Sequence, residues 1–199
     1  MKLIVLLAVY FVAIHAKKVV INNSGYYWRD WDVNEPIPAD AVVGGVSQKG
    51  HKTFIARTVY PKVGVLVPGK ACEDDDKMWF EFDNLEHESV QDVSILCSLN
   101  HERFHWVTVK EGELVSNVEK GSKELIIAAH DRPKPIAIGK KTVGAVVHIG
   151  KVIVDPDTHK FVDMRISEDG KGWGVTDSYE VLVYDNQESN CDNVVVEFS

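Results

Sequence analysis

The segment His101-Glu102-Arg103-Phe104-His105 carries the pattern H-E-x-x-H. In zinc peptidases, two histidines with this spacing bind the metal and the glutamate between them acts as a general base. That chemistry requires an α-helix, because only there do residues i and i+4 lie on one face, close enough to share an ion. The function of the motif therefore depends on the backbone around it.

The runs on either side of the motif are typical of β-strands. Val93-Ser94-Ile95-Leu96-Cys97 precedes it, and His105-Trp106-Val107-Thr108-Val109 follows. In an extended chain four residues span roughly 13 Å, whereas a zinc–nitrogen bond is about 2.0–2.1 Å. We therefore interpret the motif as a polar turn that runs into a strand, and we predict no metal site there.

Similar strand-like runs, short and rich in β-branched and aromatic residues, recur along the whole chain. Turn residues separate them, at Gly44-Gly45, Pro68-Gly69, Asp131-Arg132-Pro133, Asp155-Pro156-Asp157 and Glu168-Asp169-Gly170. No window of a dozen residues keeps a helical period. The pattern predicts an all-β protein, a sandwich or barrel, with Trp79 and Trp106 in its core.

The first sixteen residues predict a secretory signal peptide. Lys2 precedes an apolar run from Leu3 to Ile14 that is too short to cross a bilayer, and Ala16 is a small residue suited to cleavage. The mature, secreted protein then begins near Lys17 and has about 183 residues. No later apolar stretch is long enough for a membrane span.

The charge of the chain bears on its partners. Removing Lys2 takes the formal charge from -8 to about -9, and an acidic surface repels phosphate backbones, so we expect no nucleic-acid partner. Asn22 begins the sequon Asn22-Asn23-Ser24 and is a predicted glycosylation site.

Three cysteines remain after processing, Cys72, Cys97 and Cys191. An oxidising compartment favours one disulfide and one leftover thiol, and three pairings are open. Cys191 lies in a polar tail, where it is available to join two copies in a homodimer. It could equally pair with Cys97.

An internal repeat is the clearest pattern in the sequence. The segments Asp40–Gly45, Phe54–Arg57 and VGVLVPGK, which ends at Lys70, have counterparts in the same order about eighty residues later. The counterparts are Glu124–Ala129, Ala137–Lys140 and VGAVVHIGK, which ends at Lys151, and Trp28 matches Trp106. We expect an N-terminal segment (17–27), a first repeat (28–97), a second, degenerate repeat (106–183) and a C-terminal tail (184–199), with the repeats packed as one body.

These ordered motifs resemble the DM-nine repeat, a module shared by natterin-like proteins and many secreted invertebrate proteins. The first copy shows it best, in Ile37-Pro38, Ala41–Gly45, Phe54–Arg57 and Pro68-Gly69-Lys70. The second copy keeps Ile149-Gly150-Lys151 but has lost the proline and both glycines of the first.

The resemblance implies a β-sandwich of two intertwined repeats and a calcium-independent, mannose-type lectin acting in innate recognition. It implies sugar contacts from Lys70 and Lys151 and from an acid that corresponds to Asp131. A lysine–carboxylate pair suits a sugar, because adjacent hydroxyls donate to the carboxylate and accept from the ammonium.

No residues form a recognisable set for covalent catalysis, and no cofactor is implied. The acidic stretch Glu73–Asp76 lacks the spacing of a calcium loop, so we interpret it as a solvated loop. The sequence thus predicts a secreted, non-enzymatic protein that binds glycans on microbial or host surfaces. The alternative is a secreted protein-binding, lipid-binding or toxin-like component with decayed sugar sites.

Overall fold

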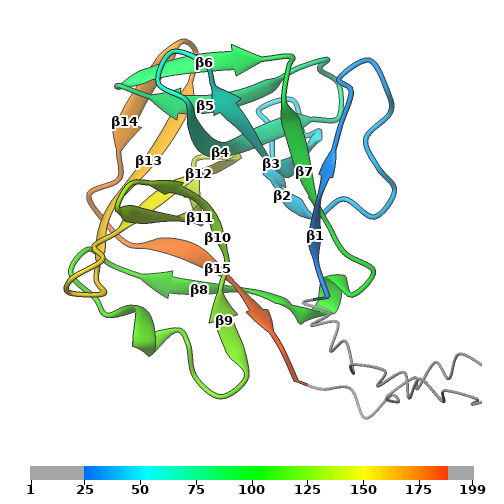
Figure 1. Cartoon of the computed structure of the whole chain (residues 1–199). Coiled ribbons are helices and arrows are strands. Elements are labelled where there is room, and N and C mark those ends of the chain that lie inside the picture. The colour runs from blue at the N-terminus through cyan, green and yellow to red at the C-terminus, as the bar shows by residue number, and fades with distance from the viewer. Residues whose placement is uncertain (1–24, 188–199) are drawn as a thin grey trace, which may run out of the picture.

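The computed structural model describes residues 25–187, and these form an antiparallel β structure (Figure 1). Within residues 25–187 the only helices are two short 3-10 turns, η1 (His101–Arg103) and η2 (Val115–Asn117). The all-β prediction is confirmed. The strands are β1 (Tyr27–Asp30), β2 (Val43–Val46), β3 (Lys52–Tyr60), β4 (Val65–Cys72), β5 (Met78–Phe82), β6 (Leu85–Ser89), β7 (Val93–Cys97), β8 (Phe104–Val109), β9 (Lys123–Leu125), β10 (Ile127–Asp131), β11 (Lys134–Val143), β12 (Val146–Val154), β13 (Phe161–Glu168), β14 (Lys171–Gly174) and β15 (Tyr179–Asp185).

Eight of these strands close into a ring, in the order β2, β3, β4, β5, β6, β14, β13 and β12. Two pairings join the part of the ring before η1 to the part after it. Val46 of β2 pairs with Val147 of β12, and Leu85 of β6 pairs with Lys171 of β14. We call β1–β7 the first half and β8–β15 the second half.

The other strands flank β3 and β11. In the first half β7 pairs with β3, and β1 pairs with β7. In the second half β10 and β15 pair with β11, and both β8 and β9 pair with β15. Figure 1 shows β5 and β6 at the top of the molecule and β8 and β9 at the bottom.

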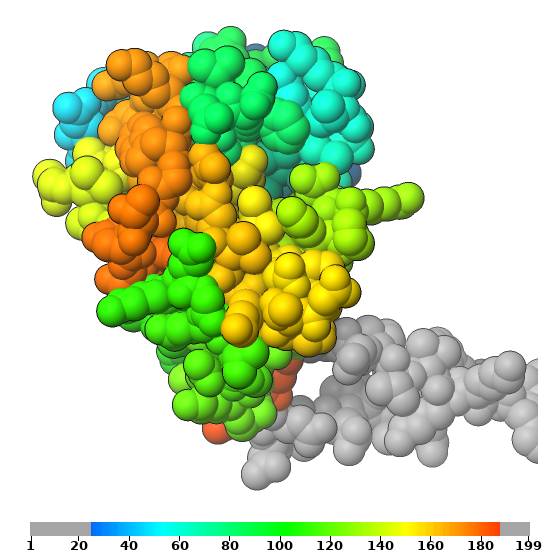
Figure 2. Space-filling view, turned by 90° about the vertical axis from the view of Figure 1, so that its left-hand side faces the viewer, coloured from blue at the N-terminus to red at the C-terminus, as the bar shows by residue number. Residues whose placement is uncertain are grey.

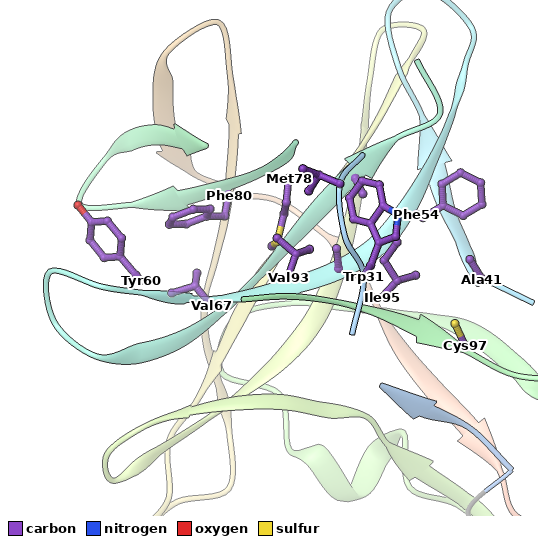
Figure 3. Close-up of a cluster of buried hydrophobic side chains, with 13 residues drawn as sticks. Trp31, Ala41, Phe54, Tyr60, Val67, Met78, Phe80, Val93, Ile95 and Cys97 are labelled. Carbon is purple, nitrogen blue, oxygen red and sulfur yellow. The ribbon is translucent and has the colours of Figure 1, made fainter. Parts of the chain in front are cut away.

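Three hydrophobic cores stabilise this arrangement. The first lies within the first half and includes Trp31, Phe54 and Phe80 (Figure 3), and the second lies within the second half around Phe161 and Met164. The third core joins the halves, with members from both. Full burial of one large apolar side chain stabilises the fold by about 1.5–3 kcal/mol, so each core contributes substantially.

Strand β3 is buried on both of its faces, which explains its apolar sequence. Phe54 and Ala56 point into the first core, whereas Ile55 between them points into the third. A strand covered on both faces has a nearly continuous apolar run instead of strict alternation. Strand β11 is built in the same way, with Ala137 in the second core and Ile138 in the third.

The prediction of turns at Gly44-Gly45 and Pro68-Gly69 is wrong, because these residues lie inside β2 and β4. A Cβ atom on Gly69 would lie 2.1 Å from the carbonyl oxygen of Trp79, and one on Gly45 would lie 2.3 Å from that of Val147. These glycines therefore allow close approach of neighbouring strands. The turns predicted at Asp155-Pro156-Asp157 and Glu168-Asp169-Gly170 are confirmed, and Asp131 ends β10 just before its turn.

The close approach at Gly69 and its counterpart Gly150 gives a stability prediction. A Cβ atom on Gly150 would lie 2.0 Å from the carbonyl oxygen of Arg165, so alanine forces two strands apart. We expect Gly69→Ala and Gly150→Ala each to lower the free energy of unfolding by about 2–3 kcal/mol or more, measured by chemical denaturation. Gly174→Ala is the control, because its Cβ would meet nothing closer than 3.3 Å. Equal losses at all three positions would contradict this explanation.

Candidate functional site

The two lysines that the sequence predicts as sugar contacts lie in the middle of strands. Lys70 is on β4, opposite Ile55 and Trp79, and Lys151 is on β12, opposite Ile138 and Arg165. Directly opposed residues of antiparallel strands share a face. Both lysines therefore share a sheet face with a third-core residue, Ile55 or Ile138, between the two halves.

Both lysines reach across to the opposite half. Lys70 Nζ donates to the carbonyl oxygen of Ser167 at 3.1 Å and lies 3.8 Å from Glu86 Oε1. Lys151 Nζ donates to the carbonyl oxygen of Glu81 at 3.1 Å and lies 2.8 Å from Glu81 Oε2. That oxygen accepts no well-directed hydrogen bond, so the second contact is an ion pair rather than a hydrogen bond. Glu81 and Glu86 are themselves direct cross-strand partners, which places all four charges together.

We call Lys70, Lys151, Glu81 and Glu86 the lysine–glutamate cluster. Its lysine side chains are 13% and 14% exposed, and the side chains of Glu81 and Glu86 are 3% and 7% exposed. Two positive and two negative charges balance, as burial of charge requires. The sequence identified the lysines but missed the glutamates, because only the register of β5 and β6 reveals that they face each other.

A buried histidine lies beside the cluster. His148 is 1% exposed, and its Nε2 atom lies 3.5 Å from Glu168 Oε2. Burial lowers the pKa of His148, and the positive charge of Lys70 lowers it further. The imidazole is therefore neutral at neutral pH and adds no third positive charge to this region.

The face that carries Lys70 continues to a half-buried tryptophan. Trp79 lies directly opposite Lys70 on one side and Glu88 on the other. Its Nε1 atom donates to Asp75 Oδ2 at 2.6 Å, and Lys77 Nζ lies 5.4 Å from the centre of its ring. Lys77 also pairs with Glu88 at 2.9 Å. We call Trp79 with these neighbours the Trp79 shelf.

The shelf corrects one expectation from the sequence. Trp79 lies outside the three cores and has a half-buried side chain, whereas Trp106 packs against the third core. The strand-like run around Trp79 gave no indication of which face was covered. Only the pairing with Lys70 shows that this indole lies on the polar face.

Asp131 does not lie with Lys151. It is exposed at the end of β10, opposite Lys134, whereas Lys151 is opposite Ile138 on the same strand β11. Four residues separate these two positions, roughly 13 Å along the sheet. This register does not bring Asp131 and Lys151 together on adjacent hydroxyls of one sugar.

The H-E-x-x-H segment forms a polar turn before a strand, as predicted. His101-Glu102-Arg103 is the 3-10 helix η1, and β8 begins at Phe104. The His101 ring bonds the carbonyl oxygen of Asp40 through Nε2 at 3.0 Å. No group of three or more histidine, cysteine or acidic side chains within residues 25–187 is placed to hold a metal ion.

Cys72 and Cys97 are free thiols on β4 and β7, with β3 between these two strands. Cys191, the sequon at Asn22 and the predicted signal peptide lie outside the described residues. Within the described residues, no helix is long and apolar enough to cross a membrane.

Comparison with known proteins gives a structural likeness only. No family model and no curated protein matches the sequence. The fold is similar to the crystal structure of the nematode sperm cell motility protein MFP2B, with a TM-score of 0.54 and 13% sequence identity. The match covers 87% of this chain and 49% of MFP2B, so the chain spans about half the length of that protein. At this identity the likeness shows the fold alone.

The lysine–glutamate cluster predicts a large loss of stability when one partner is removed. Lys151→Ala leaves Glu81 buried without its counter-ion, and we expect the free energy of unfolding to fall by about 3–5 kcal/mol. Lys49→Ala is the control, because its side chain is 79% exposed and pairs with Asp74 at 3.5 Å in contact with water. Equal effects in thermal denaturation would contradict the burial argument. Glu81→Gln in the Lys151→Ala background should recover part of the loss.

Burial also predicts unreactive thiols. It raises the pKa of Cys72 and of Cys97 to about 11, and only the thiolate is the nucleophile. In the reduced, folded protein at pH 8 we expect iodoacetamide to leave both residues unmodified, and to modify both after denaturation. Mass spectrometry of peptides locates the labels. Rapid modification of Cys97 in the folded protein would contradict this prediction.

Proposed function

We propose that the chain is a secreted, non-enzymatic recognition protein that binds carbohydrate of the mannose type, on microbial or host surfaces and in an innate-recognition role. It would bind its ligand through polar side chains that are exposed on a sheet face, and not through a cofactor. The resemblance to DM-nine repeats supplies the ligand class, and the Trp79 shelf beside Lys70 is the observation that supports a binding site.

The proposal that the chain contains two intertwined repeats is supported by matching strand pairs. In the first half β3 pairs with β4 and β7, and in the second half β11 pairs with β12 and β15. Trp28 lies opposite Leu96, and Trp106 opposite Leu182.

Each of these tryptophans also carries a cation over its ring. The Arg57 guanidinium lies 4.2 Å from the ring centre of Trp28, and Lys140 Nζ lies 4.5 Å from that of Trp106. The same residues correspond in the sequence repeat, where Trp28 matches Trp106 and Arg57 matches Lys140. A cation placed in this way over an indole contributes about 0.5–2 kcal/mol, so the contact helps to keep each pair in place.

The Trp79 shelf combines the groups that a sugar needs. The indole offers a flat apolar face for a pyranose ring, and its neighbours Lys77 and Glu88 offer an ammonium donor and a carboxylate acceptor. Glu86 and the carbonyl oxygen of Ser167 hold the Lys70 side chain in place beside Trp79. The second half has Arg165 at the position opposite Lys151, where the first half has Trp79, so it lacks this aromatic surface.

The proposal is tested by binding of the mature protein to immobilised glycans, with and without a chelator. We expect binding without metal. Glu88→Gln should weaken it at least about tenfold, because a hydrogen bond to a charged group contributes about 1.5–3 kcal/mol. Trp79→Ala should abolish stacking, whereas Trp79→Phe should retain most of the affinity.

Two choices keep this test interpretable. Lys70 is left in place, because its removal would leave Glu86 buried and unpaired. Lys49→Gln, far more exposed, is the control for a general loss of positive charge. Absence of binding by the folded protein to every glycan would overturn the proposal and favour a secreted component that binds protein or lipid.

A further inference from the structure

A polar hollow lies in the second half, away from the Trp79 shelf. Its main part, about 410 Å³, is lined by residues that follow β8 and precede β15: Lys110, Glu111, Thr176, Asp177 and Ser178. A smaller part of about 200 Å³ shares Ser178 and extends over Thr108, Lys140, Lys141, Thr142, Tyr179 and Glu180. Figure 2 shows the green segment after β8 against the orange segment before β15. We call the two parts together the β8–β15 hollow.

Paired strands position the lining of the hollow. Glu180 lies opposite both Thr108 of β8 and Lys140 of β11, so β15 carries an acid between a hydroxyl and an amine. Lys140 Nζ lies 3.2 Å from Glu180 Oε2. The hollow is therefore built on three bonded strands, and its smaller part does not depend on a loop for its shape.

A second ion pair borders the larger part. Lys141 Nζ lies 2.7 Å from Asp177 Oδ2 and donates to the carbonyl oxygen of Ser178 at 2.6 Å. The Asp177 side chain is 69% exposed, whereas that of Lys141 is 19% exposed. The ammonium is thus held by two acceptors, and the exposed carboxylate is accessible to a ligand.

The lining is chemically balanced. Three lysines face three acids, and hydroxyl groups lie between them: Lys110, Lys140 and Lys141; Glu111, Asp177 and Glu180; Thr108, Thr142, Thr176 and Ser178. A surface without net charge does not concentrate ions of either sign. Alternating donors and acceptors suit a neutral molecule that carries many hydroxyl groups.

Two further contacts fix the strands that carry the hollow. Lys140 Nζ lies 4.5 Å from the centre of the Trp106 ring, which holds the Lys140 side chain against β8. The Tyr179 side chain, 2% exposed, packs in the second hydrophobic core, so β15 presents the Glu180 side chain to the smaller part of the hollow.

We propose that the β8–β15 hollow is a second saccharide site, so that one chain binds two sugars. This inference rests on the proposed function and extends it, because the two sites lie in different halves and are built from different residues. The hollow takes an uncharged sugar through Lys141, Asp177 and Glu180. No residue of the lysine–glutamate cluster lines the hollow.

The number of sites is measured by titration calorimetry with methyl α-mannoside and with glucuronate, using the full mature chain. We expect two molecules of mannoside per chain in the wild type. One is expected in Asp177→Asn/Glu180→Gln, which keeps the size of both side chains, and one in Glu88→Gln/Trp79→Ala. Glucuronate should bind the hollow no more tightly than mannoside, because a lining without net charge offers no overall attraction to a carboxylate.

The outcomes separate the two claims. One mannoside in the wild type that persists in the hollow variant, but not in the shelf variant, would overturn the second site and leave the proposed function intact. If the wild type binds one mannoside and only the hollow variant loses it, the result would support the site in the hollow and overturn the site at the Trp79 shelf. No binding in the wild type, with near-native circular dichroism, would overturn both.

Discussion

The side chains of Lys70 and Lys151 each reach from one half of this protein to a carbonyl oxygen of the other half. The surrounding strands and charges accommodate these two contacts. Lys70 ends on the carbonyl oxygen of Ser167, and Lys151 on that of Glu81. The glycine before each lysine, Gly69 or Gly150, lets its strand pass very close to the neighbouring strand. Glu81 and Glu86 then neutralise the charges inside the ring.

This arrangement separates structural lysines from lysines available for binding. A buried ion pair contributes little net stability compared with apolar packing, but breaking it is costly, so it fixes the relative position of the two halves. The third hydrophobic core does the same beside the lysines, with Ile55 directly opposite Lys70 and Ile138 directly opposite Lys151. The Trp79 shelf and the β8–β15 hollow are placed on this rigid frame, where their side chains are free to meet a ligand.

The fold class follows from the sequence, because short β-branched runs and the absence of a helical period are local properties. The bounds of β7, Val93–Cys97, agree with the predicted run, and H-E-x-x-H forms the short 3-10 turn η1 and the start of β8 instead of an α-helix. The wrongly predicted turns are the ones that contain glycine pairs or Pro-Gly. Gly45 and Gly69 resemble turn residues, but they lie in strands whose neighbours come too close for a side chain, which only the tertiary structure shows.

The candidate sites depend on register, which the sequence does not contain. Trp79 joins Lys70 because β4 and β5 pair at that position, and Asp131 lies away from Lys151 because β10 pairs with the far end of β11. The most direct measurement of the binding account is a map of backbone amide shifts in a two-dimensional NMR titration with methyl α-mannoside. The account predicts changes confined to β4–β6 around Trp79 and to β8 and β15 around Glu180. Changes confined to the exposed end of β10 around Asp131, or none at all, would contradict it.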